Sequence, residues 1–165
     1  MLISRGLHTA TLLPGGMVLV TGGVNKLVGS NATVLSSSEL FDPVGKTWAN
    51  TRLITGATTQ MGLCRYAHTA TLLPNGQVLI AGGSGGAGSP FFPGAPLSSA
   101  ELYNPALNTW TPTPAQLNDG PRYGHTATLL SNGQVLIVGG MGLNDAPLSS
   151  AEVYDSTKKI FITLG

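Results

Sequence analysis

The chain has 165 residues, of which 42% are hydrophobic and 9% are charged, and its formal net charge is +1. The length suits one domain, the 23 glycines and 11 prolines suit many short strands and turns, and the small net charge argues against a nucleic-acid-binding surface. No apolar run is long enough to span a membrane, and a single cysteine, Cys64, excludes an internal disulfide.

Three similar units follow one another along the chain. Each opens with an arginine and, three residues later, a histidine, and the histidine recurs after 60 and then 57 residues. After the histidine, polar and apolar residues alternate, which predicts a first strand. An apolar run that ends in two glycines follows, and it predicts a second strand covered on both faces. Between these strands Asn75-Gly76 and Asn132-Gly133 predict type I′ hairpin turns, and Pro14-Gly15-Gly16 predicts the same turn.

The second half of each unit carries a glutamate nine residues before an aromatic side chain. Apolar residues and a turn sequence separate the two, so this half predicts a third and a fourth strand. The residues that recur in all three units are Arg5, Arg65 and Arg122; His8, His68 and His125; Glu39, Glu101 and Glu152; and Trp48, Trp110 and Phe161.

A residue that recurs in every unit is better explained by a repeated packing need than by chemistry performed once. We therefore expect the arginines and glutamates to form structural ion pairs within or between units. We expect the histidines to bond to neighbouring backbone, and the alternative is a metal site with one imidazole from each unit.

The arginine and histidine at the start, the glycine pair, the acidic-apolar-aromatic third strand and the late tryptophan resemble the kelch repeat over nearly the whole chain. The resemblance implies an all-β fold of kelch-type β-propeller blades, each a four-stranded antiparallel sheet. Blade 1 would cover about residues 5–51, blade 2 about 65–113 and blade 3 about 122–164, within one propeller segment over 1–165. Three blades would be half of a six-bladed ring that a homodimer completes, or a fragment of a longer propeller.

Strand parity places the connections between strands 2 and 3, and those between units, on one rim of the propeller. Loops on a rigid scaffold commonly carry binding residues, so this long-loop rim is the predicted binding face. Phe91 and Phe92 are either recognition anchors or a cover for their own blade. The candidate rim residues are Asn25, Lys26, Arg52, Tyr66, Phe91, Phe92, Asp119, Tyr123, Asn144 and Asp145.

These features favour a non-enzymatic binding or scaffold module for a protein or carbohydrate partner, with no cofactor, metal, nucleic acid or membrane span. A glycine-rich stretch from Gly82 to Gly88 leads to Pro90 and not into a helix, so it does not fit a phosphate loop. The residue sequence of the repeats is similar to that of bacterial secreted or surface kelch proteins, which predicts a secreted or cell-surface location.

Two alternatives stay open. The first is the scaffold portion of a carbohydrate-active oxidase similar to galactose oxidase, a copper enzyme with a kelch-type propeller. In that family's motif a tyrosine directly precedes the histidine position, where this chain has Leu7, Ala67 and Gly124. The second alternative is a self-assembling structural surface protein.

Overall fold

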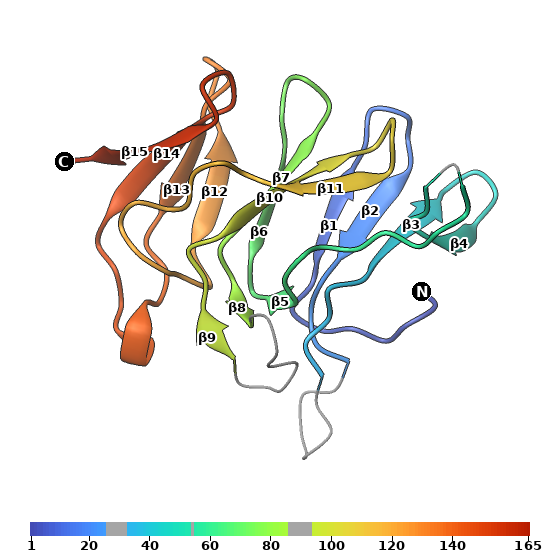
Figure 1. Ribbon diagram of the computed structural model, residues 1–165, viewed down its shortest axis with the longest axis horizontal. Coiled ribbons are helices and arrows are strands. Elements are labelled where there is room, and N and C mark those ends of the chain that lie inside the picture. The colour runs from blue at the N-terminus through green and yellow to red at the C-terminus, as the bar shows by residue number, and fades with distance from the viewer. Residues whose placement is uncertain (26–32, 54, 86–93) are drawn as a thin grey trace.

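The computed structural model describes residues 1–25, 33–53, 55–85 and 94–165 and contains three four-stranded antiparallel sheets, one from each repeat unit. Figure 1 shows the sheets side by side in chain order, from blue through green to red, with the two termini on opposite sides. The predicted all-β fold of kelch-type blades is confirmed. No helix in the described residues is long and apolar enough to cross a membrane.

Each blade uses its strands in sequence order, so every strand pairs with the next strand of the same blade. Blade 1 contains β1 (Thr9–Leu12), β2 (Val18–Thr21), β3 (Ser38–Asp42) and β4 (Thr47–Asn50). Blade 2 contains β6 (Thr69–Leu72), β7 (Val78–Ala81), β10 (Ala100–Asn104) and β11 (Thr109–Pro112). Blade 3 contains β12 (Thr126–Leu129), β13 (Val135–Val138), β14 (Ala151–Asp155) and β15 (Ile160–Leu164).

A narrow second sheet, which the sequence did not predict, extends blade 2 at its long-loop end. It consists of β5 (Arg65–Tyr66), β8 (Ser84–Gly85) and β9 (Ala95–Pro96). Single bridges at corresponding positions, such as Gly6 with Val24, replace it in blades 1 and 3. Figure 1 shows these strands and the short 3-10 helix η1 (Leu143–Asp145) together along the lower edge, while the short hairpins lie above.

The turns between the first two strands of each blade are not type I′, so that prediction is wrong. In blade 2 the Leu73 N–H donates to Gln77 O at 2.8 Å and the Gly76 N–H donates to Leu73 O at 2.9 Å. Gly76 has a φ of +81°, whereas Asn75 is not among the positive-φ residues. The loop therefore has three residues and ends in a glycine bulge, because proline at its first position requires a negative φ.

Two large hydrophobic clusters lie between the blades, and a third, smaller cluster in the described residues contains Val24, Val34 and Tyr66. Strand β7 is covered on both faces, as its continuous apolar sequence predicts. Strand β13 is exposed at Val138, on the face of blade 3 that no other blade of the described residues covers. The cluster between blades 1 and 2 consists of Leu13, Leu19, Met61, Val78, Ile80 and Tyr103. The cluster between blades 2 and 3 consists of Leu73, Leu79, Ala81, Ala100, Leu102, Leu117, Val135, Ile137, Tyr154 and Phe161.

The two glycines of each pair serve two different contacts. Gly82 has a φ of +58°, and a Cβ on it would lie 2.6 Å from Arg122 O and 2.8 Å from Cε1 of His125, both in the next blade. Gly83 has a φ of +97°, and a Cβ on it would lie 2.8 Å from atoms of its own blade. The first glycine therefore permits contact between blades, and the second permits close approach within one blade.

Substitution of the first glycine tests this assignment. We expect Gly82→Ala to lower the free energy of unfolding by about 2 to 5 kcal/mol, because a left-handed alanine and a collision with blade 3 both oppose the fold. Gly124→Ala is the matched control, since Gly124 has a φ of +63° and no atom within 4 Å of a Cβ. The control should cost only about 1 to 2 kcal/mol. Urea unfolding measures both, and equal losses would contradict the role of Gly82.

Candidate functional site

The recurring arginine of each blade is buried and forms an ion pair with the recurring glutamate of the same blade. In blade 2 the Arg65 guanidinium donates to Gly82 O at 2.7 Å, to Ser99 O at 3.1 Å and to Glu101 Oε1 at 2.8 Å. Glu101 also accepts the Gly62 N–H at 2.7 Å. One ion pair therefore joins the glycine pair, the strand β10 and the connector from the preceding blade.

The corresponding pairs in the other two blades differ in strength. Arg5 lies 2.7 Å from Glu39, whereas Arg122 lies 3.4 Å from Glu152. Burial raises the pKa of Glu39, but hydrogen bonds from the Leu2 N–H and from Arg5 outweigh it, so the pKa lies below its ordinary value. Burial raises the pKa of Glu152 above its ordinary value, since the longer contact with Arg122 compensates less.

His68 and His125 bond to side chains of the preceding blade, not to backbone as the sequence predicted. Nε2 of His68 lies 2.9 Å from the Thr9 hydroxyl, and Nε2 of His125 lies 3.0 Å from the Thr69 hydroxyl. Burial and the charge of Arg65 lower the pKa of His68 to about 3, and burial lowers the pKa of His125 to about 4. Both imidazoles are therefore neutral at physiological pH. Among the described residues no group of three His, Cys, Asp or Glu side chains could hold a metal ion.

Three of the candidate rim residues come together beside blade 3. The Tyr123 hydroxyl donates a hydrogen bond to Asp145, which raises the pKa of the Tyr123 phenol. Asn144 and Asp145 are exposed and have left-handed φ values of +56° and +57°. Met141 and Leu143 of the same loop are 39% and 62% exposed. We call Tyr123, Met141, Leu143, Asn144 and Asp145 the blade 3 patch.

The other candidate rim residues do not join this patch. Tyr66 is buried with Val24 and Val34, and the Asn25 side chain accepts the Thr33 N–H. Asp119 accepts a hydrogen bond from Thr163, at the outer strand of blade 3.

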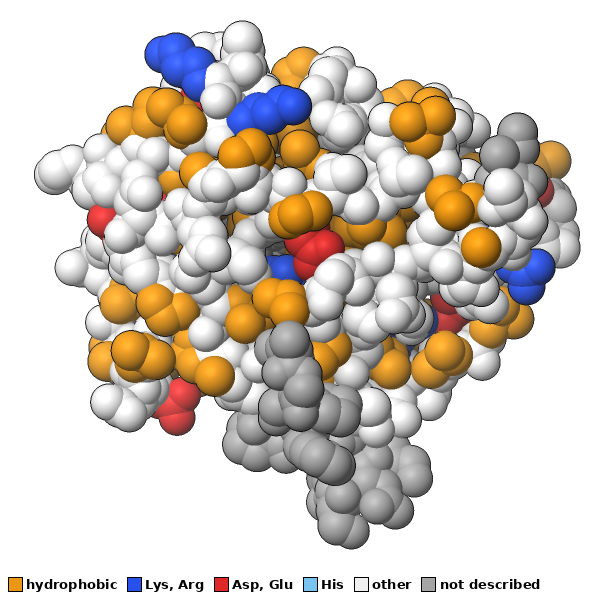
Figure 2. All heavy atoms as spheres, in the orientation of Figure 1, with side chains coloured by type: hydrophobic (Ala, Val, Ile, Leu, Met, Phe, Trp, Pro, Cys, Tyr) orange, Lys and Arg blue, Asp and Glu red, His pale blue; other side chains and the backbone are white. Residues whose placement is uncertain are grey.

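Arg52 lies away from the long-loop rim, in a hollow that it shares with Leu107 and Asn108 of the β10–β11 hairpin. Lys26, Phe91 and Phe92 lie outside the described residues. Figure 2 shows that charged side chains are sparse on the face in view.

Sequence reasoning missed Met141 and Leu143, and it also missed a cavity on the opposite rim. The cavity has a volume of about 680 Å³ and lies among the short hairpins of blades 1 and 2. The sequence did contain one signal for both sites, because each includes residues that depart from the repeat. Met141 and Leu143 are apolar residues in a short loop, and Asn108 stands where the other units carry Lys46 and Lys159.

Comparison with known proteins agrees with the repeat pattern. The sequence model of the Kelch motif matches residues 65–115. The chain is 29% identical over 148 residues to the human protein named Kelch-like protein 33, which covers 90% of this chain and 24% of that protein. It is 31% identical over 103 residues to a Colwellia psychrerythraea protein named uridylate kinase, which covers 55% of this chain and 40% of that protein. The chain therefore spans less than half the length of either relative.

The neutral histidines predict a loss of stability in mild acid. In the unfolded chain an imidazole gains a proton near pH 6.5, whereas folded His68 and His125 keep pKa values of about 3 and 4. The unfolded state therefore binds more protons below pH 6.5, and stability falls as the pH falls. Between pH 7 and 5 we expect each histidine to contribute a loss of about 1 to 2 kcal/mol.

Urea unfolding at pH 7, 6 and 5 measures this slope. The double variant His68→Gln, His125→Gln is the control, and its stability should change much less across the same range. A flat profile for the unmodified chain, or an equal slope in the double variant, would contradict the assignment.

Proposed function

Because the chain belongs to the kelch-repeat family, we propose that it is a non-enzymatic binding or scaffold module that holds a protein partner on its long-loop rim. The observation that carries the proposal is that repeated and non-repeated residues lie in different places. The repeated Arg65, Glu101 and His68 are buried and bonded inside the framework. The non-repeated residues of the blade 3 patch are exposed or half-buried at the end of the sheet.

The blade 3 patch has the chemistry of a protein contact. It combines exposed apolar side chains, Met141 and Leu143, with a phenol and a carboxylate that are already bonded to each other. Left-handed backbone at Asn144 and Asp145 fixes the loop in an uncommon shape, as at many binding sites. A partner segment with an apolar side chain and a donor group would fit this surface.

The other candidate functions stay predictions from the sequence: a carbohydrate partner, an oxidase scaffold, a self-assembling surface protein and a secreted or surface location. The structure adds one observation on phosphate chemistry. Gly82 and Gly83 lead into strand β8, so this glycine pair does not open a helix that could bind a phosphate group.

The rim proposal can be tested by panning a library of random 12-residue peptides against the chain. Met141 and Leu143 are changed together to Asp in one variant, and Val44 and Leu107, which are 91% and 62% exposed on the short hairpins, are changed together in the control. Peptides selected on the unmodified chain should bind the first variant at least about tenfold more weakly and the control equally well. A selection in which no peptide distinguishes the two variants would contradict the proposal.

We further propose that a second copy of the chain covers the open faces of blades 1 and 3. Val138 on blade 3 is 38% exposed, while Ala81 at the same position in blade 2 is 1% exposed. Leu12 on the opposite face of blade 1 is 64% exposed. The open face of blade 3 corresponds to the face of blade 2 that packs against blade 3. The open face of blade 1 corresponds to the face of blade 2 that packs against blade 1.

The polar groups on the two open faces are also complementary. Between blades, the Gly23 N–H donates to Arg65 O at 2.8 Å and the Gly83 N–H donates to Arg122 O at 2.8 Å. The corresponding groups are the Gly140 N–H on blade 3 and Arg5 O on blade 1. Between blades a threonine hydroxyl also bonds to a histidine. The corresponding groups on the open faces are Thr126 on blade 3 and His8 on blade 1. Two copies would therefore repeat existing contacts and close a ring of six blades.

Light scattering after gel filtration tests this assembly. We expect twice the mass of one chain, and Gly139→Ala should convert the dimer to monomer with an unchanged circular dichroism spectrum. In a single chain the atom nearest to a Cβ at Gly139 is 3.3 Å away, whereas a Cβ at the equivalent Gly22 would lie 2.5 Å from Arg65 O. A soluble monomer at about 100 µM, a concentration at which a micromolar dimer would form, would contradict the proposal.

A further inference from the structure

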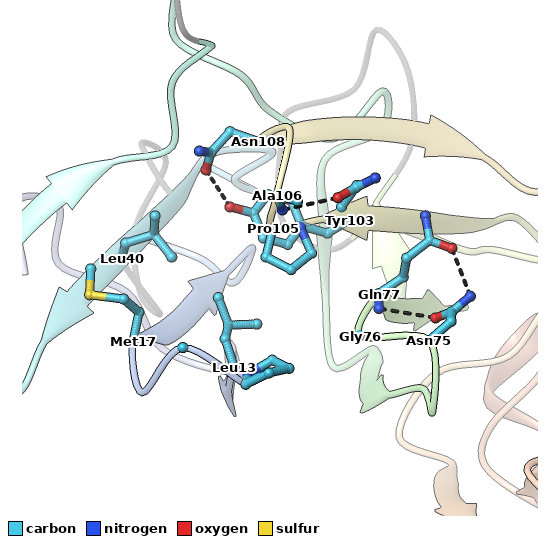
Figure 3. Close-up of a pocket in the computed structure, with 13 residues that line it drawn as sticks. Leu13, Met17, Leu40, Asn75, Gly76, Gln77, Tyr103, Pro105, Ala106 and Asn108 are labelled. Atoms are coloured by element: carbon cyan, nitrogen blue, oxygen red, sulfur yellow. Dashed lines mark hydrogen bonds between the residues drawn. The ribbon is translucent and has the colours of Figure 1, made fainter.

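The cavity of about 680 Å³ lies between blades 1 and 2, on the rim opposite the blade 3 patch. Figure 3 shows Leu13, Met17 and Leu40 of blade 1 on one side, facing Asn75 and Gln77 of the β6–β7 hairpin across the hollow. The β10–β11 hairpin closes the third side with Pro105, Ala106 and Asn108 (Figure 3). The volume falls within the range of about 300 to 1,000 Å³ that is typical of ligand pockets.

Departures from the repeat make this cavity neutral. Asn104 and Asn108 line it, whereas blade 1 has Asp42 and Lys46 at the same positions and blade 3 has Asp155 and Lys159. No charged side chain is among the residues that line it in the described part of the chain.

The apolar wall is a departure from the repeat as well. Met17 of blade 1 stands where the other blades carry Gln77 and Gln134. The equivalent hollow between blades 2 and 3 has about 360 Å³ and includes Asp155. The larger cavity is therefore the one that combines an apolar wall with uncharged amides.

The amide side chains are held in place with donor groups left over. The Tyr103 hydroxyl donates to Asn108 Oδ1 at 2.6 Å, which leaves the Asn108 amide N–H groups without a bond among the described residues. Asn75 donates to Gln77 Oε1 at 3.1 Å and accepts the Gln77 N–H at 3.0 Å. These bonds fix Gln77 and leave its side-chain N–H groups without a bond to any other residue that the structure describes. Such prepositioned donors favour a ligand that brings acceptors.

We propose that this cavity binds an uncharged, extended peptide segment of a partner, with an apolar side chain against Met17 and Leu40. Backbone carbonyl oxygens of the segment accept hydrogen bonds from the amides of Gln77 and Asn108. An uncharged segment is favoured because a buried charge would have no counter-ion in this lining. The site is separate from the blade 3 patch, so either can fail without the other.

The probe is the capped pentapeptide acetyl-Gly-Ser-Leu-Ser-Gly-amide, titrated into the full chain and followed by ¹H–¹⁵N NMR. We expect saturable shifts of the side-chain amide signals of Gln77 and Asn108, with a Kd on the order of 1 mM for so short a peptide. The alanine analogue should bind at least about fivefold more weakly, since it buries less apolar area. An analogue with Asp in place of both Ser residues should bind more weakly still.

Two substitutions remove the neutral amide and the apolar wall of the cavity by introducing residues found at the same positions in other blades. Asn108→Lys and Met17→Gln introduce the residues that other blades carry, so the fold should persist, and each should weaken leucine-peptide binding at least about tenfold. Lys159→Asn, the reverse change in blade 3, is the control and should leave binding unchanged. The Met141 and Leu143 double variant should also bind normally, which separates this site from the rim proposal.

Three results would overturn the proposal. The first is the absence of saturable shifts at 10 mM peptide, about tenfold above the expected Kd. The second is equal binding of the leucine and alanine peptides. The third is unchanged binding by Asn108→Lys with intact NMR dispersion, which would show that the peptide lies elsewhere.

Discussion

The rest of the structure depends on the close approach of one blade's glycine pair to the start of the next blade. Gly82 lies against Arg122 O and the His125 ring at distances that leave no room for a side chain. The same step brings Thr69 into contact with His125. Histidine and glycine recur together because each blade-to-blade contact uses both, while the arginine contributes only its backbone carbonyl to that contact.

The buried ion pair then holds the approach in place from inside one blade. Arg65 bonds at once to Gly82 O, to Ser99 O and to Glu101, so it fixes the end of β7, the start of β10 and the connector. An isolated buried charge would be strongly unfavourable, and several hydrogen bonds together offset its desolvation. The weaker contact in blade 3 shows that the framework accepts some variation, since Arg122 lies 3.4 Å from Glu152 and still bonds to Gly139 O.

The sequence predicted the blades well because each strand has a local signal and the signal occurs three times. It identified Arg5, Glu39 and their repeats as ion-pair residues because charges at fixed positions in an apolar chain need partners. It failed on the turn at Asn75, where the extra loop residue was not recognised, and on the partner of His68, which belongs to another blade. The turn was a local signal that was misread, because Pro74 before Asn75 already favours the three-residue loop. The partner of His68 depends on packing between blades, which no local pattern encodes.

The cavity between blades 1 and 2 was unpredictable for a related reason. Its wall combines Leu13, Met17 and Leu40 with hairpin residues of the next unit, and only the packing of two blades brings them together. What the sequence does contain is the departure of Asn104 and Asn108 from the Asp and Lys of the other units. A position that repeats must make the same contact in all three blades. A role that belongs to one blade can therefore arise only at positions where the units differ. The blade 3 patch and the cavity lie on opposite rims, so the two proposed sites would not compete for one surface.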